Sequence, residues 1–452
     1  MFRKYKAKYL ILILLSLIFY LSSLLNCTSP TKTETVTFSG AVTLADTTDY
    51  SGVEVMLFKP VTIDTMLLNL NKNYPGVGIE LNQCTEFYWR EHEPVYRTTT
   101  DAQGHWKIEN VGPGTYHIVA KKDGYGWRVW YDVQHTSVPA MTLKKAIVWQ
   151  GTYDKPVVVP ANSFVQVRDH AEFTAGLTLE AGSIVEFQNR NGKRNMDISV
   201  AGGFNVQGTE ENPVYIFADD TVNSDAFTIE KTQQAQMTCA VVQQVQNGFY
   251  FKQIPTVLMR HNRLQNMQTG LTVTECDSLL IEGNFFSDFG ESAIKTFDSH
   301  SRIMRNFIVK CKRIGLDSKN AKNSIVKYNV LIGHNIYGIA FNLEGYRYQS
   351  SNVKLCYNDF TNNKNHIFIG RRINGRFNNN NFYDSDQYDV FALLRYNADT
   401  LNFKENFWGT IKQFSIKEKI YDITGKVYDY FKGPIINYND FKLNIIKWWQ
   451  NI

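Results

Sequence analysis

An asparagine recurs at a nearly constant interval through the second half of this 452-residue chain. Successive members are 22, 22, 23, 29, 23 and 25 residues apart, and they are Asn262, Asn284, Asn306, Asn329, Asn358, Asn381 and Asn406. Two further residues follow each asparagine, and in five of the seven cases both are apolar or aromatic. Repeats of this length are typical of solenoids, in which each coil buries its apolar side chains only against neighbouring coils.

A second periodic position supports this register. A small residue followed by an apolar one recurs every 22 or 23 residues, at Gly248, Gly270, Ala293, Gly315 and Gly338. The interval after Asn329 is about six residues longer than its neighbours, and the excess lies between Leu343 and Ser351. We expect that stretch to leave the coil as a loop.

The asparagines are expected to be structural. In a parallel solenoid, side chains at the same position of successive coils lie about 4.8 Å apart. Asparagine tolerates the left-handed backbone region of turns, and stacked asparagines form amide ladders that satisfy buried polar groups. The apolar residues that follow them should then form the core.

The N-terminus has the pattern of an export signal. Four basic residues between positions 3 and 8 precede an apolar run from Tyr9 to Leu25, which Cys27 closes. The Leu24-Leu25-Asn26-Cys27 segment resembles the lipobox of bacterial lipoproteins, whose cysteine is acylated and becomes the mature N-terminus. This resemblance implies lipidation at Cys27 and a lipid-anchored place in the bacterial cell envelope. The alternative is an uncleaved membrane anchor, because about 17 apolar residues lie at the lower limit for a span.

Residues 35–146 have the pattern of a small β-sandwich. Strands at 40–44, 52–57, 98–108 and 110–120 are separated by Asp/Gly and Gly-Pro-Gly turns. Their order resembles the carboxypeptidase regulatory-like, transthyretin-type domain. Residues 60–94 exceed what that family needs, so we interpret them as an inserted loop. The aromatic residues Tyr125, Trp127, Trp130 and Tyr131 are expected to pack where the sandwich meets the solenoid.

After Ala146 the pattern changes to short apolar strands separated by glycines. Segments 177–187, 198–209 and 212–217 resemble the first coils of right-handed parallel β-helix proteins. Residues 406–410 resemble the sequence that ends many such domains. We therefore predict an all-β fold, an N-terminal β-sandwich followed by a right-handed parallel β-helix. The predicted division is a signal peptide (1–27), a linker (28–34), the sandwich (35–146), the β-helix (147–410) and a C-terminal capping segment (411–452).

The cysteines indicate neither a disulfide framework nor a zinc site. Without Cys27 five remain, an odd number, and no Cys-x-x-Cys pair occurs. We expect them to be small core residues.

Resemblance to β-helix enzymes, many of which are polysaccharide lyases, hydrolases or epimerases, directs attention to acidic residues. One outward position of successive coils holds Thr272, Lys295, Asp317 and Ala340. Only one of these residues is acidic, so the position does not form a row of acids. Another holds Glu275, Asp298 and Asn320, with His300 close by in sequence. These residues could bind calcium or form a carboxylate pair, but Asp and Asn are also common in turns for backbone reasons. Glu275, Asp298 and His300 are the catalytic candidates, and no cofactor other than calcium is indicated.

Charge is unevenly distributed along the chain. The net charge is +5, which does not by itself indicate nucleic-acid binding. Nine lysines and arginines but only two aspartates lie between Lys295 and Val330, and the candidate ligand-binding residues among them are Arg302, Arg305, Lys310, Lys312, Arg313 and Lys319. Coiling should concentrate them in a band that could bind uronic-acid glycans or anionic lipid headgroups. Alternatively, the band only keeps the solenoid soluble and blocks edge pairing.

These patterns favour a non-catalytic envelope protein whose β-helix binds a polysaccharide or a cell-surface protein. A carbohydrate-active enzyme, a lyase or epimerase, is the alternative, and a structural component of a surface layer is a third possibility. Fold resemblance alone cannot choose among them, because function depends on the site.

Overall fold

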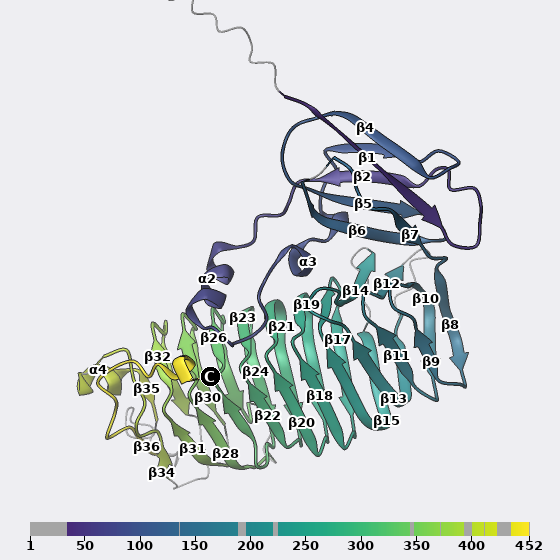
Figure 1. The fold of residues 1–452 in the computed structure, drawn as a ribbon. Coiled ribbons are helices and arrows are strands. Elements are labelled where there is room, and N and C mark those ends of the chain that lie inside the picture. The colour runs from purple at the N-terminus through teal and green to yellow at the C-terminus, as the bar shows by residue number, and fades with distance from the viewer. Residues whose placement is uncertain are drawn as a thin grey trace, which may run out of the picture.

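A computed structural model describes residues 34–134, 136–188, 196–219, 225–343, 348–370, 372–392, 400–410, 412–422 and 435–451. Figure 1 shows two units, an N-terminal pair of small sheets and a long parallel solenoid below it. The predicted signal peptide and Cys27 lie outside the described residues. Within the described ranges, no helix has the length and apolar character needed to cross a membrane.

The N-terminal unit contains two sheets that enclose a core of its own. One sheet has the order β4-β1-β7 and the other β3-β2-β5-β6. Phe38, Val55, Trp106 and Ile118 are buried in the core between them. The strands are β1 (Val36–Leu44), β2 (Glu54–Phe58), β3 (Tyr96–Thr99), β4 (His105–Val111), β5 (Tyr116–Lys122), β6 (Gly126–Val133) and β7 (Met141–Leu143).

The segment between β2 and β3 is not a bare loop. It contains α2 (Thr65–Asn73), α3 (Gln83–Glu86) and the 3₁₀ turn η1 (Trp89–Glu91). In Figure 1 this segment leaves the sandwich and runs over the solenoid toward its later coils. We call residues 60–94 the strap.

The solenoid has about ten turns and is built from three parallel sheets. Longer strands bend at a corner and contribute to two sheets. Sheet 1 contains the first parts of β8 (Ile147–Tyr153), β10 (Phe164–Phe173), β19 (Arg263–Thr274) and β21 (Phe285–Phe297), together with β12 (Ile184–Gln188), β14 (Val214–Asp219), β16 (Ala240–Gln243), β23 (Phe307–Cys311), β26 (Val330–Ile332), β29 (Asp359–Thr361) and β32 (Asn381–Tyr383).

The other two sheets follow in chain order within each coil. Sheet 2 contains the second parts of β8, β10, β19 and β21, the first parts of β13 (Ile198–Gln207) and β15 (Asp225–Thr238), and β17 (Asn247–Lys252), β24 (Ile314–Lys319), β27 (Tyr337–Phe341), β30 (Asn365–Ile369), β33 (Tyr388–Ala392) and β35 (Ile420–Tyr421). Sheet 3 contains the second parts of β13 and β15, and β9 (Val157–Val159), β11 (Leu177–Glu180), β18 (Thr256–Arg260), β20 (Ser278–Glu282), β22 (Ser301–Met304), β25 (Ile325–Lys327), β28 (Ser350–Cys356), β31 (Ile373–Asn378), β34 (Thr400–Asn402) and β36 (Ile435–Asn437).

The predicted asparagine ladder fills the corner between sheets 3 and 1. The backbone N–H and side-chain Nδ2 of Asn284 both donate to Oδ1 of Asn306, each at 2.9 Å. The same Nδ2 also donates to the Met259 carbonyl, 3.2 Å away. Each ladder amide therefore closes its own corner and joins it to the next coil, which satisfies polar groups that are fully buried.

One member of the predicted ladder is wrong. Asn380, not Asn381, continues the ladder, because its backbone N–H and Nδ2 donate to Oδ1 of Asn406 at 2.7 and 3.1 Å. The residue before each ladder position has a left-handed backbone, and Asn379 fills that place with φ 57°. Asn381 is thereby shifted into sheet 1, where its side chain bonds to Asp359 instead.

The small-residue positions lie where coils approach most closely. A Cβ on Gly270 would come within 2.6 Å of the Ala293 carbonyl oxygen, and one on Gly338 within 2.8 Å of the His366 carbonyl oxygen. The register predicted from these positions is confirmed, since Thr272, Lys295, Asp317 and Ala340 pair along sheet 2. The five cysteines in the described part of the chain are all free.

The end of the chain contacts two places on the solenoid. Beyond α4 (Gln413–Glu418), Tyr438 and Phe441 pack against the solenoid core. The 3₁₀ turn η2 (Trp448–Asn451) then lies on sheet 1, where the Trp448 ring stacks 5.9 Å from the Tyr74 ring of the strap. The all-β architecture with N-terminal sheets and a parallel solenoid is therefore confirmed.

Candidate functional site

The acidic residues singled out in the sequence do stack on successive coils. Glu275, Asp298 and Asn320 occupy the corner between sheets 2 and 3, each with a left-handed backbone. The Asn320 amide donates to Asp298 Oδ1, and Gln253 Nε2 donates to Glu275 Oε2 at 2.7 Å. Burial raises the pKa of Asp298, and the nearby Glu275 carboxylate acts in the same direction.

His300 does not complete a catalytic group with these acids. Its side chain is exposed, and its backbone forms hydrogen bonds with Cys276 and Leu279. Within the described ranges, no three His, Cys, Asp or Glu side chains are placed to hold a metal ion. The geometry of this corner is that of turn residues bonded to their neighbours on adjacent coils.

The predicted basic band is divided among the faces of the solenoid, because consecutive residues of one coil point in different directions. Arg302 is exposed on sheet 3. Two others face the strap side: Lys310 pairs with Asp64 of the strap at 2.7 Å, and the Arg305 carbonyl accepts from Gly78 at 2.7 Å. Those two help to hold the strap and do not form a free patch.

The remaining residues of the band lie around sheet 2. Lys312 and Arg313 precede β24, and Lys319 ends it. Arg313 lies 3.3 Å from Glu291, and Lys319 lies 3.7 Å from Asp317. No residue of this group touches the strap in the contacts of the described chain.

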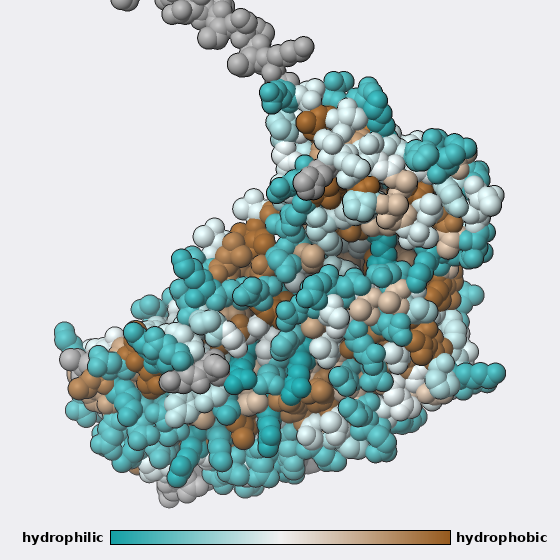
Figure 2. Space-filling model, in the orientation of Figure 1, coloured by the Kyte–Doolittle hydropathy of each residue, from teal (hydrophilic) through white to brown (hydrophobic). Residues whose placement is uncertain are grey.

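Sheet 1 is the face that the rest of the molecule covers. Its outward positions are apolar over several coils, at Phe285, Phe307, Val309, Val330 and Ile332. The strap covers them with Leu67, Leu70, Val77 and Leu81. In Figure 2 the N-terminal unit and the solenoid form one continuous surface, and hydrophilic residues dominate the lower left part of the solenoid.

Three charged residues are buried within this covered face, Glu186, Arg263 and Asp359, and we call them the clamp residues. They lie on β12, β19 and β29, so they are distributed along most of the length of the strap. Each one bonds to a different strap residue.

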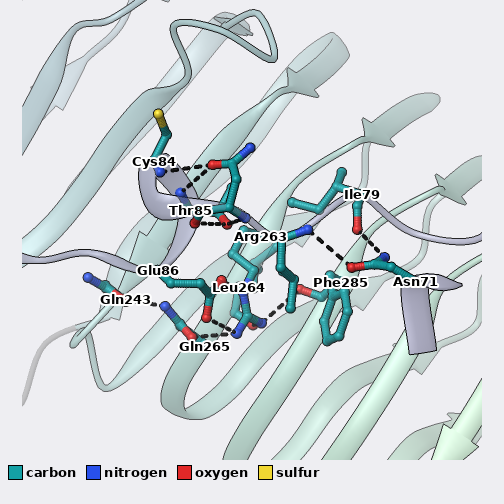
Figure 3. Close-up of polar contacts among 12 residues, drawn as sticks. Asn71, Ile79, Cys84, Thr85, Glu86, Gln243, Arg263, Leu264, Gln265 and Phe285 are labelled. Atoms are coloured by element: carbon teal, nitrogen blue, oxygen red, sulfur yellow. Dashed lines mark hydrogen bonds and ion pairs between the residues drawn. The ribbon is translucent and has the colours of Figure 1, made fainter. Parts of the chain in front are cut away.

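Arg263 is the central clamp residue. Its Nε and Nη2 donate to the two carboxylate oxygens of Glu86 at 2.8 and 3.1 Å. Figure 3 shows the pair facing each other between α3 and sheet 1, with Gln265 and Gln243 extending the row of hydrogen bonds. The guanidinium carbon lies 4.8 Å from the centre of the Phe285 ring. The bidentate geometry and the polar neighbours compensate a charge that is excluded from water.

Glu186 joins all three parts of the molecule. Arg90 of the strap donates to it through Nε and Nη2 at 3.0 and 3.1 Å. Trp127 of the sandwich donates through Nε1 at 3.3 Å, and Gln188 of the solenoid through Nε2 at 2.9 Å. Around it, Tyr88 stacks on Phe217 with ring centres 4.3 Å apart.

The aromatic residues that precede the solenoid divide between two environments. Trp127 and Tyr131 pack at the contact between sandwich and solenoid. Tyr125 and Trp130 pack against the core of the sandwich itself. The expectation of interface packing is thus met by two of the four.

Asp359 receives hydrogen bonds from both ends of the chain. Tyr74 of the strap donates its hydroxyl at 2.7 Å, Trp448 near the C-terminus donates Nε1 at 2.8 Å, and Asn381 donates Nδ2 at 2.6 Å. Burial raises the pKa of Asp359 to about 6, although these three donors act to lower it. Strap and C-terminal segment are therefore held on sheet 1 by the same carboxyl group.

The clamp residues were not predicted, but the sequence carried a signal for the covered face. In a strand, adjacent side chains point to opposite faces, so a pair such as Phe285-Phe286 must place one ring outside the coil. Strands that are apolar on both faces are buried on both faces. The bulky pairs after the asparagines thus indicated a cover for sheet 1.

Comparison with known proteins matched part of the solenoid. Residues 206–417 are similar to the family described as periplasmic copper-binding protein (NosD), a parallel β-helix family. Searches of curated proteins and of solved structures gave no significant match.

Among the described residues, the His, Cys, Asp and Glu side chains form no group of three that could hold copper. Copper in proteins is held mainly by thiolate, thioether and imidazole ligands. Cys311 and His334 lie on adjacent coils, but the Cys311 backbone N–H donates to His334 Nδ1 at 3.2 Å. Burial raises the pKa of the Cys311 thiol and lowers that of His334 to about 3. These side chains belong to the core, and no further described His, Cys, Asp or Glu completes a ligand set with them.

Removing one partner of the buried ion pair should loosen the strap. Glu86→Ala leaves the Arg263 charge buried without its carboxylate, and we expect a loss of about 3–5 kcal/mol in the free energy of unfolding. Urea unfolding measures this loss, and limited proteolysis reports cleavage within the strap. The control is Glu54→Ala, which removes the partly exposed pair with Lys121 and should cost less than about 1 kcal/mol. Equal losses of unfolding free energy in the two variants would contradict the conclusion that the buried pair of Glu86 and Arg263 holds the strap.

Titration of Asp359 should make its contribution to stability depend on pH. In the unfolded chain this carboxyl titrates near pH 4. Because its folded pKa is about 6, the folded protein binds more protons between these values, so the contribution of Asp359 falls as pH rises through this window. The unfolding free energy of wild type minus that of Asp359→Asn should therefore decrease from about pH 4 to about pH 6.

The comparison with Asp359→Asn removes the effect of the other buried groups. His117, His334 and His366, whose pKa values burial lowers, favour stability at higher pH in both proteins alike. Urea unfolding at several pH values gives the difference, and Asp288→Asn on an exposed turn serves as the control. A pH-independent difference would contradict this account.

Proposed function

We propose that this chain is an exported, lipid-anchored protein of the bacterial cell envelope that presents a non-catalytic β-solenoid for binding glycans or other proteins. The observation that carries the proposal is the closure of sheet 1. The sandwich, the strap and the C-terminal segment are all fixed on that face through the clamp residues. This arrangement is suited to a rigid support that leaves sheets 2 and 3 as long lateral surfaces.

Similarity to a periplasmic family supports a location in the cell envelope. The lipobox-like segment ending in Cys27 supports a lipid anchor, and the sandwich would then connect that anchor to the solenoid. The acidic corner supports the non-catalytic part of the proposal. Its carboxylates are bonded to Gln253 and Asn320, and the described His300 side chain forms no hydrogen bond or ion pair with them.

The lipid anchor is tested by metabolic labelling with radiolabelled palmitate in a bacterial host. We expect label in the wild-type protein and in Cys84→Ser, and none in Cys27→Ser. Cys84 is a suitable control because it is a free cysteine on the strap. Continued labelling of Cys27→Ser would contradict lipidation at that residue.

Catalysis is tested by incubating the purified full chain with acidic and neutral polysaccharides. Retention on a polysaccharide without new reducing or unsaturated ends is the expected result. Formation of such ends that disappears in Asp298→Ala would overturn the non-catalytic assignment. Asp288→Ala is the matched control, because Asp288 also occupies a left-handed turn position, with φ 61°.

A further inference from the structure

A second aromatic surface lies on the outer face of sheet 2, over the later coils. Phe368, Phe391 and Tyr421 pair in register on β30, β33 and β35. Tyr337 and Tyr388 belong to a neighbouring row of the same face, with Asn365 between them. We call these five aromatic residues the sheet 2 strip.

The rings of the strip form a continuous ladder along the solenoid axis. Their centres are 4.9 Å apart between Tyr337 and Phe368, 5.8 Å between Phe368 and Phe391, and 4.7 Å between Phe391 and Tyr421. Tyr388 adds a ring 5.5 Å from Phe391. These spacings are close to the repeat of the coils, about 4.8 Å, because each coil contributes at least one ring to the strip.

Apolar and polar groups alternate along this strip. Tyr337, Tyr388 and Tyr421 are half-buried and combine an apolar ring with a hydroxyl. Asn365 is only 5% exposed, and its Oδ1 lacks a hydrogen-bond partner among the described residues. A ligand that has both apolar C–H faces and hydroxyl donors would match this surface.

Cations border the strip. Arg313 lies at its edge, because the Arg313 carbonyl accepts from the backbone N–H groups of Ile336 and Tyr337 at 3.0 and 3.1 Å. Lys364 directly precedes Asn365 and is exposed, as is Lys312 beside Arg313. In the described chain neither lysine makes an ion pair, so both are available to an anionic ligand. Glu291 and Asp317 are nearby acids that contact Arg313 and Lys319 respectively, and the exposed Asp386 lies beside Lys364, since its backbone N–H donates to the Asn363 carbonyl.

The two aromatic faces of the solenoid therefore differ in their surroundings. Sheet 1 is covered by the strap and the C-terminal segment, and its charges are paired within the protein. The apolar residues packed together on the sheet 2 face come from β24, β27, β30 and β33 and from the adjoining Leu343. No strap residue takes part in this group.

We propose that the sheet 2 strip binds an acidic polysaccharide, a polymer of uronic acid units, lying along the solenoid axis. Sugar rings present an apolar C–H face that packs on aromatic rings, hydroxyls that reach the hydroxyls of the half-buried tyrosines, and carboxylates that meet Lys312, Arg313 and Lys364. The regular step of the ladder suits a regular polymer more than a compact ligand. This inference rests on the proposed binding function and assigns it a face and a ligand class.

The test is affinity electrophoresis of the full chain in detergent through gels containing polygalacturonate or a neutral β-glucan. Wild type should be retarded by polygalacturonate, and less so as salt increases, because exposed charges are screened. Tyr388→Ala should weaken binding about tenfold, whereas Tyr388→Phe should keep most of it. Lys364→Gln should weaken binding several-fold and reduce the salt dependence. Arg302→Gln, the same loss of charge on sheet 3, should leave binding unchanged.

Each alternative result has a distinct meaning. Retardation that is unaffected in Tyr388→Ala and Lys364→Gln would overturn the assignment to sheet 2, while the proposed binding function would stand. Equal weakening in Arg302→Gln would show a general charge effect and would also overturn it. Equal retardation by the neutral β-glucan, or none by polygalacturonate, would overturn the acidic ligand class. Loss of folding in Tyr388→Ala is detected by urea unfolding, and Lys364→Gln then decides.

Discussion

Sheet 1 has apolar side chains on both of its faces, and the rest of the structure follows from the need to cover the outer one. A sheet exposed to water on one side would carry polar residues there. Here Phe285, Phe307 and Val330 point outward, so burying them removes a large apolar area from water. Apolar contact alone would allow the strap to shift along such a face. The buried charges at Glu186, Arg263 and Asp359 remove that freedom, because each is compensated only when its own partner is opposite.

Sheet 1 and sheet 2 serve different purposes: sheet 1 supports the covering segments, and sheet 2 is the face proposed to bind a ligand. On sheet 1 every buried charge has a partner within the chain, and the covering segments come from both ends of the sequence. On sheet 2 a comparable aromatic row borders Lys312 and Lys364, which form no ion pair with the described residues, and Arg313, which pairs with Glu291. The same repeat can therefore serve two purposes, because successive positions of one coil face different surroundings. Function on this fold belongs to a particular face and not to the coil as a whole.

The sequence was informative about repetition and much less so about contacts between distant segments. The ladder was predicted because stacking imposes one residue type at one interval, and only the Asn380/Asn381 choice failed, since adjacent asparagines give the same signal. The strap could not be placed, because no local pattern links Glu86 to Arg263, 177 positions later. The basic band was misjudged for a related reason: nearness in sequence around a coil does not mean a shared face. The sheet 2 strip escaped notice because Phe368, Phe391 and Tyr421 are separated by a coil each.

The strap also fixes the order in which the molecule can be completed. Three strap residues form hydrogen bonds with the clamp residues of the solenoid. The pairs are Arg90 with Glu186, Glu86 with Arg263, and Tyr74 with Asp359, at sequence separations of 96, 177 and 285 residues. In a chain that emerges from its N-terminus, the partners of these contacts therefore become available in that order, from one end of the strap to the other as new coils are added. Trp448 comes last and shares the final carboxyl group. A chain truncated before Trp448 leaves Asp359 without one of its donors, so the state of the covered face depends on a residue that lies 89 positions beyond that carboxyl group.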